Sequence, residues 1–118
     1  MEAQDLMKVI AGAASDKKAT HIIAQNLQGK SSLCDYQIIC SGSNERQTQA
    51  ISSHIEELLR QQKLGKPYAI EGKQTGHWIL MDYGSVMIHI FLDSIRDFYA
   101  LERLWPDAER ITFDETRA

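Results

Sequence analysis

The sequence has no excess of positive charge, few cysteines and no long apolar run. It holds 13 lysines and arginines against 16 acidic residues, for a formal net charge of −3. This balance excludes phosphate neutralisation as the main source of an affinity for nucleic acid. Two cysteines, Cys34 and Cys40, are too few for a disulfide framework or a zinc site, and their apolar surroundings favour buried free thiols. Without an N-terminal signal or an apolar segment of about 18 residues, we expect a cytoplasmic protein with no membrane span.

What is present is an ordinary globular composition. The 118 residues, 43% of them hydrophobic and 25% charged, suffice for one domain with a single core. The charge is uneven, because residues 93–118 carry seven acids and four arginines, whereas residues 1–92 carry nine charges of each sign. This asymmetry fits a basic partner for the C-terminal part, and it fits a solvated acidic tail at least as well.

Hydrophobic periodicity predicts helices that alternate with strands. Apolar residues recur at helical spacing over residues 2–16. Asn44 with Gln47 forms a capping-box pattern at the start of a second helix, which Gly65 and Pro67 stop. Strands are predicted at residues 20–27, 35–41, 68–71, 77–82 and 85–92.

A last helix is predicted after these strands. Asp93 is expected to cap it and Pro106 to end it. Its apolar contacts are expected from Ile95, Phe98, Leu101, Leu104 and Trp105. The complete pattern predicts a single-domain α+β (α/β) fold with a mixed, about five-stranded β-sheet and flanking helices.

The clearest pattern is a hairpin over residues 77–92. A two-residue loop at Tyr83 and Gly84 predicts a register with Asp82 opposite Ser85 and Trp78 opposite His89. Because side chains alternate across a sheet, one face collects an aliphatic set suited to the core: Ile79, Met81, Val86, Ile88 and Ile90. The other face collects larger and partly polar residues: Trp78, Leu80, Met87, His89 and Phe91.

The second hairpin face has more than one interpretation. Helices on both sides of the sheet would make Trp78 and its neighbours a second core. The polar His89 beside Trp78 fits poorly in a sealed core, so we favour an exposed patch that binds a protein partner. The same patch could instead pair two copies of the chain.

The sequence shows no conventional active site. Ser41, Gly42 and Ser43 lie between a strand and a helix start, where backbone N–H groups could cradle a phosphate, although a turn with a helix cap explains them about as well. A nucleotidyltransferase also needs a strand with two carboxylates for Mg²⁺, and residues 86–90 contain no acid. No metal-ligand spacing links the histidines, which are His21, His54, His77 and His89.

Four segments resemble the ribosomal silencing factor family, the Iojap-like proteins. They read DYQIICSGSNERQ at residues 35–47, GHWILMDYG at 76–84, VMIHIF at 86–91 and FYALERLW at 98–105. The resemblance runs from about Leu6 to about Asp107, so we assign residues 1–107 to a ribosomal silencing factor domain and residues 108–118 to an acidic C-terminal tail.

The resemblance implies a non-enzymatic factor without cofactor or metal, whose fold resembles the nucleotidyltransferases without their metal-binding acids. Family members bind the large ribosomal subunit through its fourteenth ribosomal protein, on the face that meets the small subunit. They thereby block subunit joining and repress translation when nutrients are short. A nucleotide-binding or nucleotidyltransferase-like enzyme that uses the turn of Ser41, Gly42 and Ser43 is the alternative.

The resemblance also implies which residues meet the partner. Carried onto this sequence, the family's binding surface comprises Trp78, Leu80, Met87, His89, Tyr99 and Glu102. Asp82, Tyr83 and Gly84 match the family's turn, while Met87 stands where a β-branched residue is commoner. Acids beyond Asp93 suit a basic ribosomal protein. A minor ribosomal RNA contact is allowed by scattered lysines, namely Lys17, Lys18, Lys63, Lys66 and Lys73, and the protein is expected to be a monomer or a weak homodimer.

Overall fold

The computed structural model describes residues 1–113, apart from the side chain of Phe98. The elements are α1 (Ala3–Asp16), β1 (Thr20–Asn26), β2 (Tyr36–Gly42), α2 (Glu45–Gln61), β3 (Ala69–Glu71), β4 (Trp78–Asp82), β5 (Val86–Leu92), α3 (Asp93–Tyr99), the 3₁₀ helix η1 (Leu101–Leu104) and β6 (Glu109–Thr112). The predicted single-domain α+β fold is confirmed. Within residues 1–113, no helix is long and apolar enough to cross a membrane.

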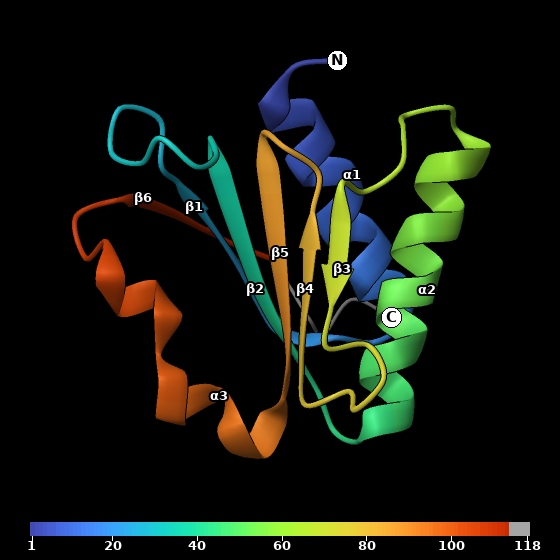
Figure 1. The fold of residues 1–118 in the computed structure, drawn as a ribbon. Helices are drawn as coiled ribbons and strands as arrows, with labels where there is room; N and C mark the ends of the chain where they lie inside the picture. Colours follow the sequence, from blue (N-terminus) through green and yellow to red (C-terminus); the bar gives the residue numbers. More distant parts are fainter. Residues whose placement is uncertain (114–118) are drawn as a thin grey trace.

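The strands form one mixed sheet in the order β3-β4-β5-β2-β1-β6 (Figure 1). The central β2–β5 pair is parallel, and the other neighbours are antiparallel. The sequence predicted about five strands and missed β6, which pairs with β1 so that Ile111 lies opposite Ala24. This strand lies in the segment assigned to the acidic tail, and residues 114–118 of that tail lie outside the described residues.

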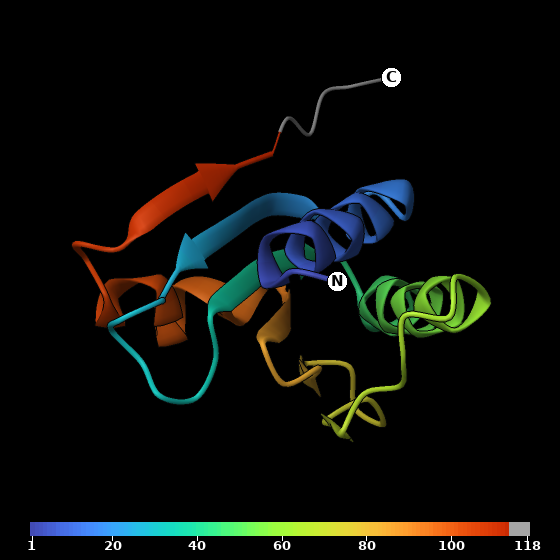
Figure 2. The same ribbon diagram turned by 90° about the horizontal axis from the view of Figure 1, so that it is seen from above.

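Helices α1 and α2 lie side by side over one face of the sheet (Figure 2). Their inward stripes include Met7 and Ile10 from α1 and Ile51 and Ile55 from α2, all fully buried. The predicted aliphatic face of the hairpin is confirmed beneath them, because Ile79, Met81, Val86, Ile88 and Ile90 are fully buried. Burying each such side chain contributes roughly 1.5–3 kcal/mol, so this layer is the main core.

The start of α2 follows its predicted cap with one difference. Asn44 Oδ1 accepts a hydrogen bond from the Gln47 backbone N–H at 2.8 Å, as a capping residue should. Gln47 Oε1 accepts from the backbone N–H of Ser43 at 2.7 Å rather than from that of Asn44. The side chain of Gln47 also donates to the carbonyls of Lys17 and Lys18, so it joins the start of α2 to the end of α1.

The last helix is shorter than predicted. α3 ends at Tyr99 because Ala100 adopts the left-handed conformation (φ 46°, ψ 49°), and the chain continues as η1. The prediction of one helix up to Pro106 is therefore wrong, as is the prediction that Asp93 caps it, since Asp93 is its first residue and Leu92 precedes it without a side-chain cap. α3 packs against β2 and β5 on the face of the sheet opposite α1 and α2 (Figure 2).

Candidate partner-binding surface

The sheet face opposite α1 and α2 is only half covered. Over β1 and β2, buried polar side chains attach η1, because Gln37 donates to Gln25 Oε1 at 3.1 Å and Gln25 Nε2 donates to the Glu102 carbonyl at 2.9 Å. Over β4 and the start of β5 the face stays partly open. We call this part the open hairpin face. Its half-buried residues are Trp78, Leu80 and Met87, and its exposed residues are Glu71 and Tyr99.

The hairpin turn fixes which side chains meet on this face. Asp82 Oδ1 accepts from the Gly84 N–H at 2.8 Å, Gly84 takes the left-handed φ of 83°, and Tyr83 N–H donates to the Val86 carbonyl at 3.0 Å. The two-residue loop is therefore Gly84 and Ser85, one residue later than predicted.

The predicted register is consequently wrong by two residues. Trp78 lies opposite Phe91, and Leu80 lies opposite His89. Because a shift of two preserves the alternation of side chains, the two faces keep their predicted members. Asp82 and Gly84 shape the turn, and the ring of Tyr83 is buried in the main core.

Trp78 lies at the border between the covered and the open halves. Its indole stacks on the fully buried Phe91 with ring centroids 4.9 Å apart, and it contacts the ring of Tyr99 at 4.6 Å. Tyr99 is 45% exposed. The structure therefore brings Trp78 and Tyr99, two residues of the predicted binding set, into direct contact.

His89 is not exposed, contrary to the expectation from the sequence. Only 9% of its surface is accessible, and its Nδ1 accepts a hydrogen bond from Trp78 Nε1–H at 3.1 Å. Burial lowers the pKa of His89 to about 4, so the imidazole is neutral at physiological pH. The polar ring fits a nearly sealed site because its neighbour supplies the hydrogen bond. Phe91, expected on the same exposed face, is fully buried.

A cavity of about 350 Å³ opens beside Trp78 and Leu80, with Glu71 and Gly72 completing its lining. The sequence did not predict Glu71 on this face, because β3 is only three residues long and gives no pattern by which to assign its faces. Its pairing with Leu80 places it on the open hairpin face. Met87, at the other side of this face, packs against a second small cluster that contains Leu27 and Cys34.

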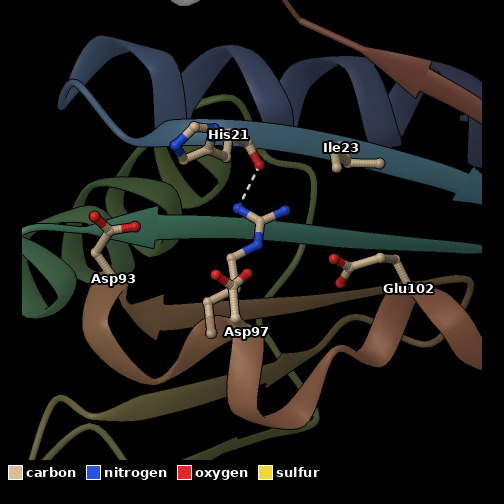
Figure 3. Close-up of a pocket in the computed structure, with 6 residues that line it drawn as sticks. His21, Ile23, Asp93, Asp97 and Glu102 are labelled. Carbon is tan, nitrogen blue, oxygen red and sulfur yellow. Dashed lines mark hydrogen bonds between the residues drawn. The ribbon is translucent and has the colours of Figure 1, made fainter.

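An acidic pocket of about 290 Å³ lies between β1 and α3. Asp93, Arg96 and Asp97 of α3 and Glu102 of η1 line it together with His21 and Ile23 of β1 (Figure 3). Arg96, only 5% exposed, donates from Nη1 to the His21 carbonyl at 2.6 Å and to Ser41 Oγ at 2.9 Å. Glu102 Oε1 is buried without a hydrogen-bond partner among the described residues.

Glu102 belongs to the binding set predicted from the sequence, whereas Arg96 does not. An arginine between helix acids looks like one more surface charge, and its burial depends on His21, which lies 75 residues away in the chain. A bulge of β1, where the pairing register with β2 shifts between Thr20 and Ile23 and His21 takes φ 51°, accompanies this contact.

The turn of Ser41, Gly42 and Ser43 does not offer a free anion cradle. The Ser43 N–H donates to Gln47 Oε1, and the Ser41 hydroxyl accepts from Arg96. A Cβ on Gly42 would lie 2.9 Å from the Thr48 side chain, so this glycine permits close packing of α2 on β2. The motif is explained by structural contacts of the protein itself.

The cysteines are buried free thiols, as predicted. Burial raises the pKa of Cys34 to about 11 and that of Cys40 to about 12, so both stay protonated and unreactive. Within residues 1–113 no group of three or more His, Cys, Asp or Glu side chains could hold a metal ion.

Fold and surface thus define a small α+β protein with a mixed six-stranded sheet and one half-open, aromatic sheet face. The family model described as "Ribosomal silencing factor during starvation" matches residues 1–118. The ribosomal silencing factor RsfS of Halalkalibacterium halodurans is 34% identical over 114 residues, which are 97% of each chain. The chain belongs to the ribosomal silencing factor family, and the resemblance seen in its motifs is confirmed.

More distant relatives and a solved structure agree with this assignment. The maize chloroplast protein Iojap is 33% identical over 92% of this chain and 47% of its own length. Mouse mitochondrial assembly of ribosomal large subunit protein 1 is 37% identical over 60% of this chain and 32% of its own length. A crystal structure of a protein from Chromobacterium violaceum, 28% identical, superposes with a TM-score of 0.86 and covers 99% of this chain and 98% of that one.

Proposed function

We propose that this silencing factor acts without enzymatic chemistry, by binding the large ribosomal subunit through its fourteenth ribosomal protein in the cytoplasm. The open hairpin face is the observation that carries the proposal, because a half-buried tryptophan beside an exposed tyrosine is the kind of anchor that protein interfaces use. The name of the mouse relative, which refers to assembly of the ribosomal large subunit, supports that subunit as the partner.

Charge supports a basic protein as the direct contact. The pocket between β1 and α3 is lined by three carboxylates, those of Asp93, Asp97 and Glu102, against one arginine, Arg96, which is already hydrogen-bonded within the protein. Glu102 Oε1 lies buried without a donor within residues 1–113, so a lysine or arginine of the partner would supply the missing hydrogen bond. Opposite charges across an interface raise the association rate and fix orientation.

The proposed mechanism is steric exclusion of the small subunit. The molecule measures 35 × 34 × 30 Å, a body that cannot share the space between two surfaces that must touch. Bound on the joining face, it lowers translation when nutrients are limiting. This mechanism requires neither turnover nor a bound ligand.

Co-sedimentation with separated ribosomal subunits tests the proposal. We expect the protein to pellet with the large subunit and to reduce its joining with the small subunit. Preference for the small subunit, or for neither, would contradict the assignment. The nucleotide-binding alternative predicts micromolar affinity for ATP with Mg²⁺ in calorimetry, and we expect no heat of binding.

Truncation of Trp78 tests the surface. Tryptophans at the centre of an interface often contribute about 2 kcal/mol or more, so Trp78→Ala should weaken binding to the large subunit roughly 30-fold. His54→Ala, which removes a ring from α2 on the other side of the sheet, is the matched control and should bind like the unaltered protein. Equal affinity of a folded Trp78→Ala variant would show that another surface binds.

A further inference from the structure

The indole N–H of Trp78 is already hydrogen-bonded before any partner arrives. Trp78 Nε1 lies 3.1 Å from His89 Nδ1, although the two residues are diagonal rather than direct neighbours across β4 and β5. Their ring centroids are 6.0 Å apart with planes inclined by 44°. Indole nitrogen can only donate a hydrogen bond, so His89 Nδ1 is the acceptor and the ring proton of the neutral imidazole is on Nε2.

Three contacts together fix the orientation of the Trp78 ring. Phe91 supports one face at 4.9 Å, Tyr99 lies against it at 4.6 Å, and the hydrogen bond to His89 removes the remaining freedom of rotation about the side chain. The two ring contacts are non-directional and permit the indole to slide or flip, whereas the hydrogen bond has one allowed direction. His89 is therefore the group that selects one orientation.

His89 is badly placed to meet a partner itself. It is 9% exposed, and its ring centroid lies 6.3 Å from that of the buried Phe91. A partner that docks on the open hairpin face would contact Trp78, which lies closer to the surface than the imidazole of His89.

We propose that His89 is a positioning residue, which holds the Trp78 indole in its docking orientation through the Nε1–H···Nδ1 hydrogen bond and does not contact the partner. This inference rests on the proposed function and assigns to His89 a role different from the direct contact implied by the family resemblance. A pre-oriented anchor loses less conformational entropy on binding than a mobile one.

Two substitutions separate the acceptor from the rest of the imidazole. His89→Leu fills a similar volume without an acceptor, whereas His89→Asn places a carbonyl oxygen close to the position of Nδ1. In the unaltered protein we expect a scalar coupling across the hydrogen bond between Trp78 Nε1 and His89 Nδ1, measured by NMR with ¹⁵N labelling. The indole hydrogen of Trp78 should exchange with solvent faster in His89→Leu and stay protected in His89→Asn.

Affinity for the large subunit gives the decisive measurement. We expect His89→Leu to bind about three- to tenfold more weakly, the effect of freeing one large side chain, and His89→Asn to recover most of the loss. In a Trp78→Ala background, His89→Leu should cause no further loss, because there is no indole left to orient. A general loss of structure would lower affinity in both backgrounds, and thermal unfolding of every variant checks the fold.

The outcomes distinguish this inference from the proposed function. If Trp78→Ala weakens binding and His89→Leu does not, the positioning role is wrong and the surface stands. If His89→Asn protects the indole but binds as weakly as His89→Leu, the imidazole contacts the partner directly and the inference is overturned. If the unaltered protein fails to bind the large subunit, the proposed function itself fails, while the NMR coupling still reports on the hydrogen bond.

Discussion

Among single residues, His89 links the stability of this fold to pH. Folding lowers its pKa from 6.5 to about 4 because the imidazolium would lose its hydration in the buried site. Between these two values the unfolded chain binds a proton that the folded chain excludes. The contribution to stability is therefore complete above pH about 6.5 and is lost as the pH falls toward 4. We expect this group to lower the free energy of unfolding by at most about 3 kcal/mol over that range.

Urea unfolding at pH 7 and at pH 4.5 measures this effect when the protein is compared with His89→Leu. Carboxylates titrate in both proteins, so the difference between their two pH slopes belongs to His89. The unaltered protein should lose more stability on acidification than the variant does. Identical slopes would mean that His89 is hydrated in the folded state.

Among the elements, α3 depends on one side chain for its position. A helix of seven residues has little stability of its own, and Arg96 attaches it to β1 and β2 through the His21 carbonyl and the Ser41 hydroxyl. Arg96→Met would remove the donor of both hydrogen bonds. We expect a loss of about 2–3 kcal/mol in the free energy of unfolding, together with faster amide exchange in α3.

Arg103→Met, at an exposed position of η1, is the control and should change stability by no more than about 0.5 kcal/mol. Equal effects of the two substitutions would show that α3 is held by other contacts.

Sequence patterns predicted the elements that carry a clear apolar period and missed those that depend on distant contacts. The hairpin faces followed from alternation, but the register did not, because the bond from Gly84 N–H to Asp82 Oδ1 moves the turn by one residue. No sequence pattern around Ala100 indicates a left-handed residue, so the sequence did not predict the break in the last helix. The strand β6 reads ERIT, two charged residues followed by two uncharged ones, so it shows no alternation that would predict a strand. It is a strand because β1 offers an unpaired edge.

The sequence predicted which residues belong to the candidate surface better than it predicted how exposed each of them is. Trp78 and Tyr99 share the open hairpin face as expected. His89 is buried instead, and its burial is tolerated because Trp78 Nε1–H donates a hydrogen bond to its Nδ1. Glu71 and Arg96 carried no local signal, since each takes its place from a partner strand. Whether the whole set binds a partner stays a prediction.

For the whole molecule, we expect the position of the acidic residues to affect partner binding more than the formal net charge of −3 does. The acids that line the pocket at α3 and η1 should attract a basic partner over a distance that salt screening limits to about 10 Å at 0.1 M. We expect Glu102→Lys to slow association with the large subunit at low salt and to flatten the dependence of the rate on salt. Stopped-flow mixing with fluorescently labelled subunits measures both quantities.

Glu57→Lys makes the same change in net charge on α2, behind the sheet. Its ion pair with Arg60 is exposed and contributes little to stability, so the variant should fold normally. A much smaller effect on the association rate is expected, because the substituted charge lies far from the pocket. Similar slowing by the two substitutions would indicate attraction by net charge alone.

The parallel pairing of β2 with β5 at the centre of the sheet has a consequence for synthesis of the protein. Tyr36 lies opposite Val86, so the middle of the sheet cannot close until about fifty further residues have left the ribosome, and β1 gains its outer neighbour only with β6. Sheets built from such distant segments fold slowly compared with helical proteins. The open hairpin face belongs to the same sheet, so it can be complete only after β5 has been synthesised and has paired with β2.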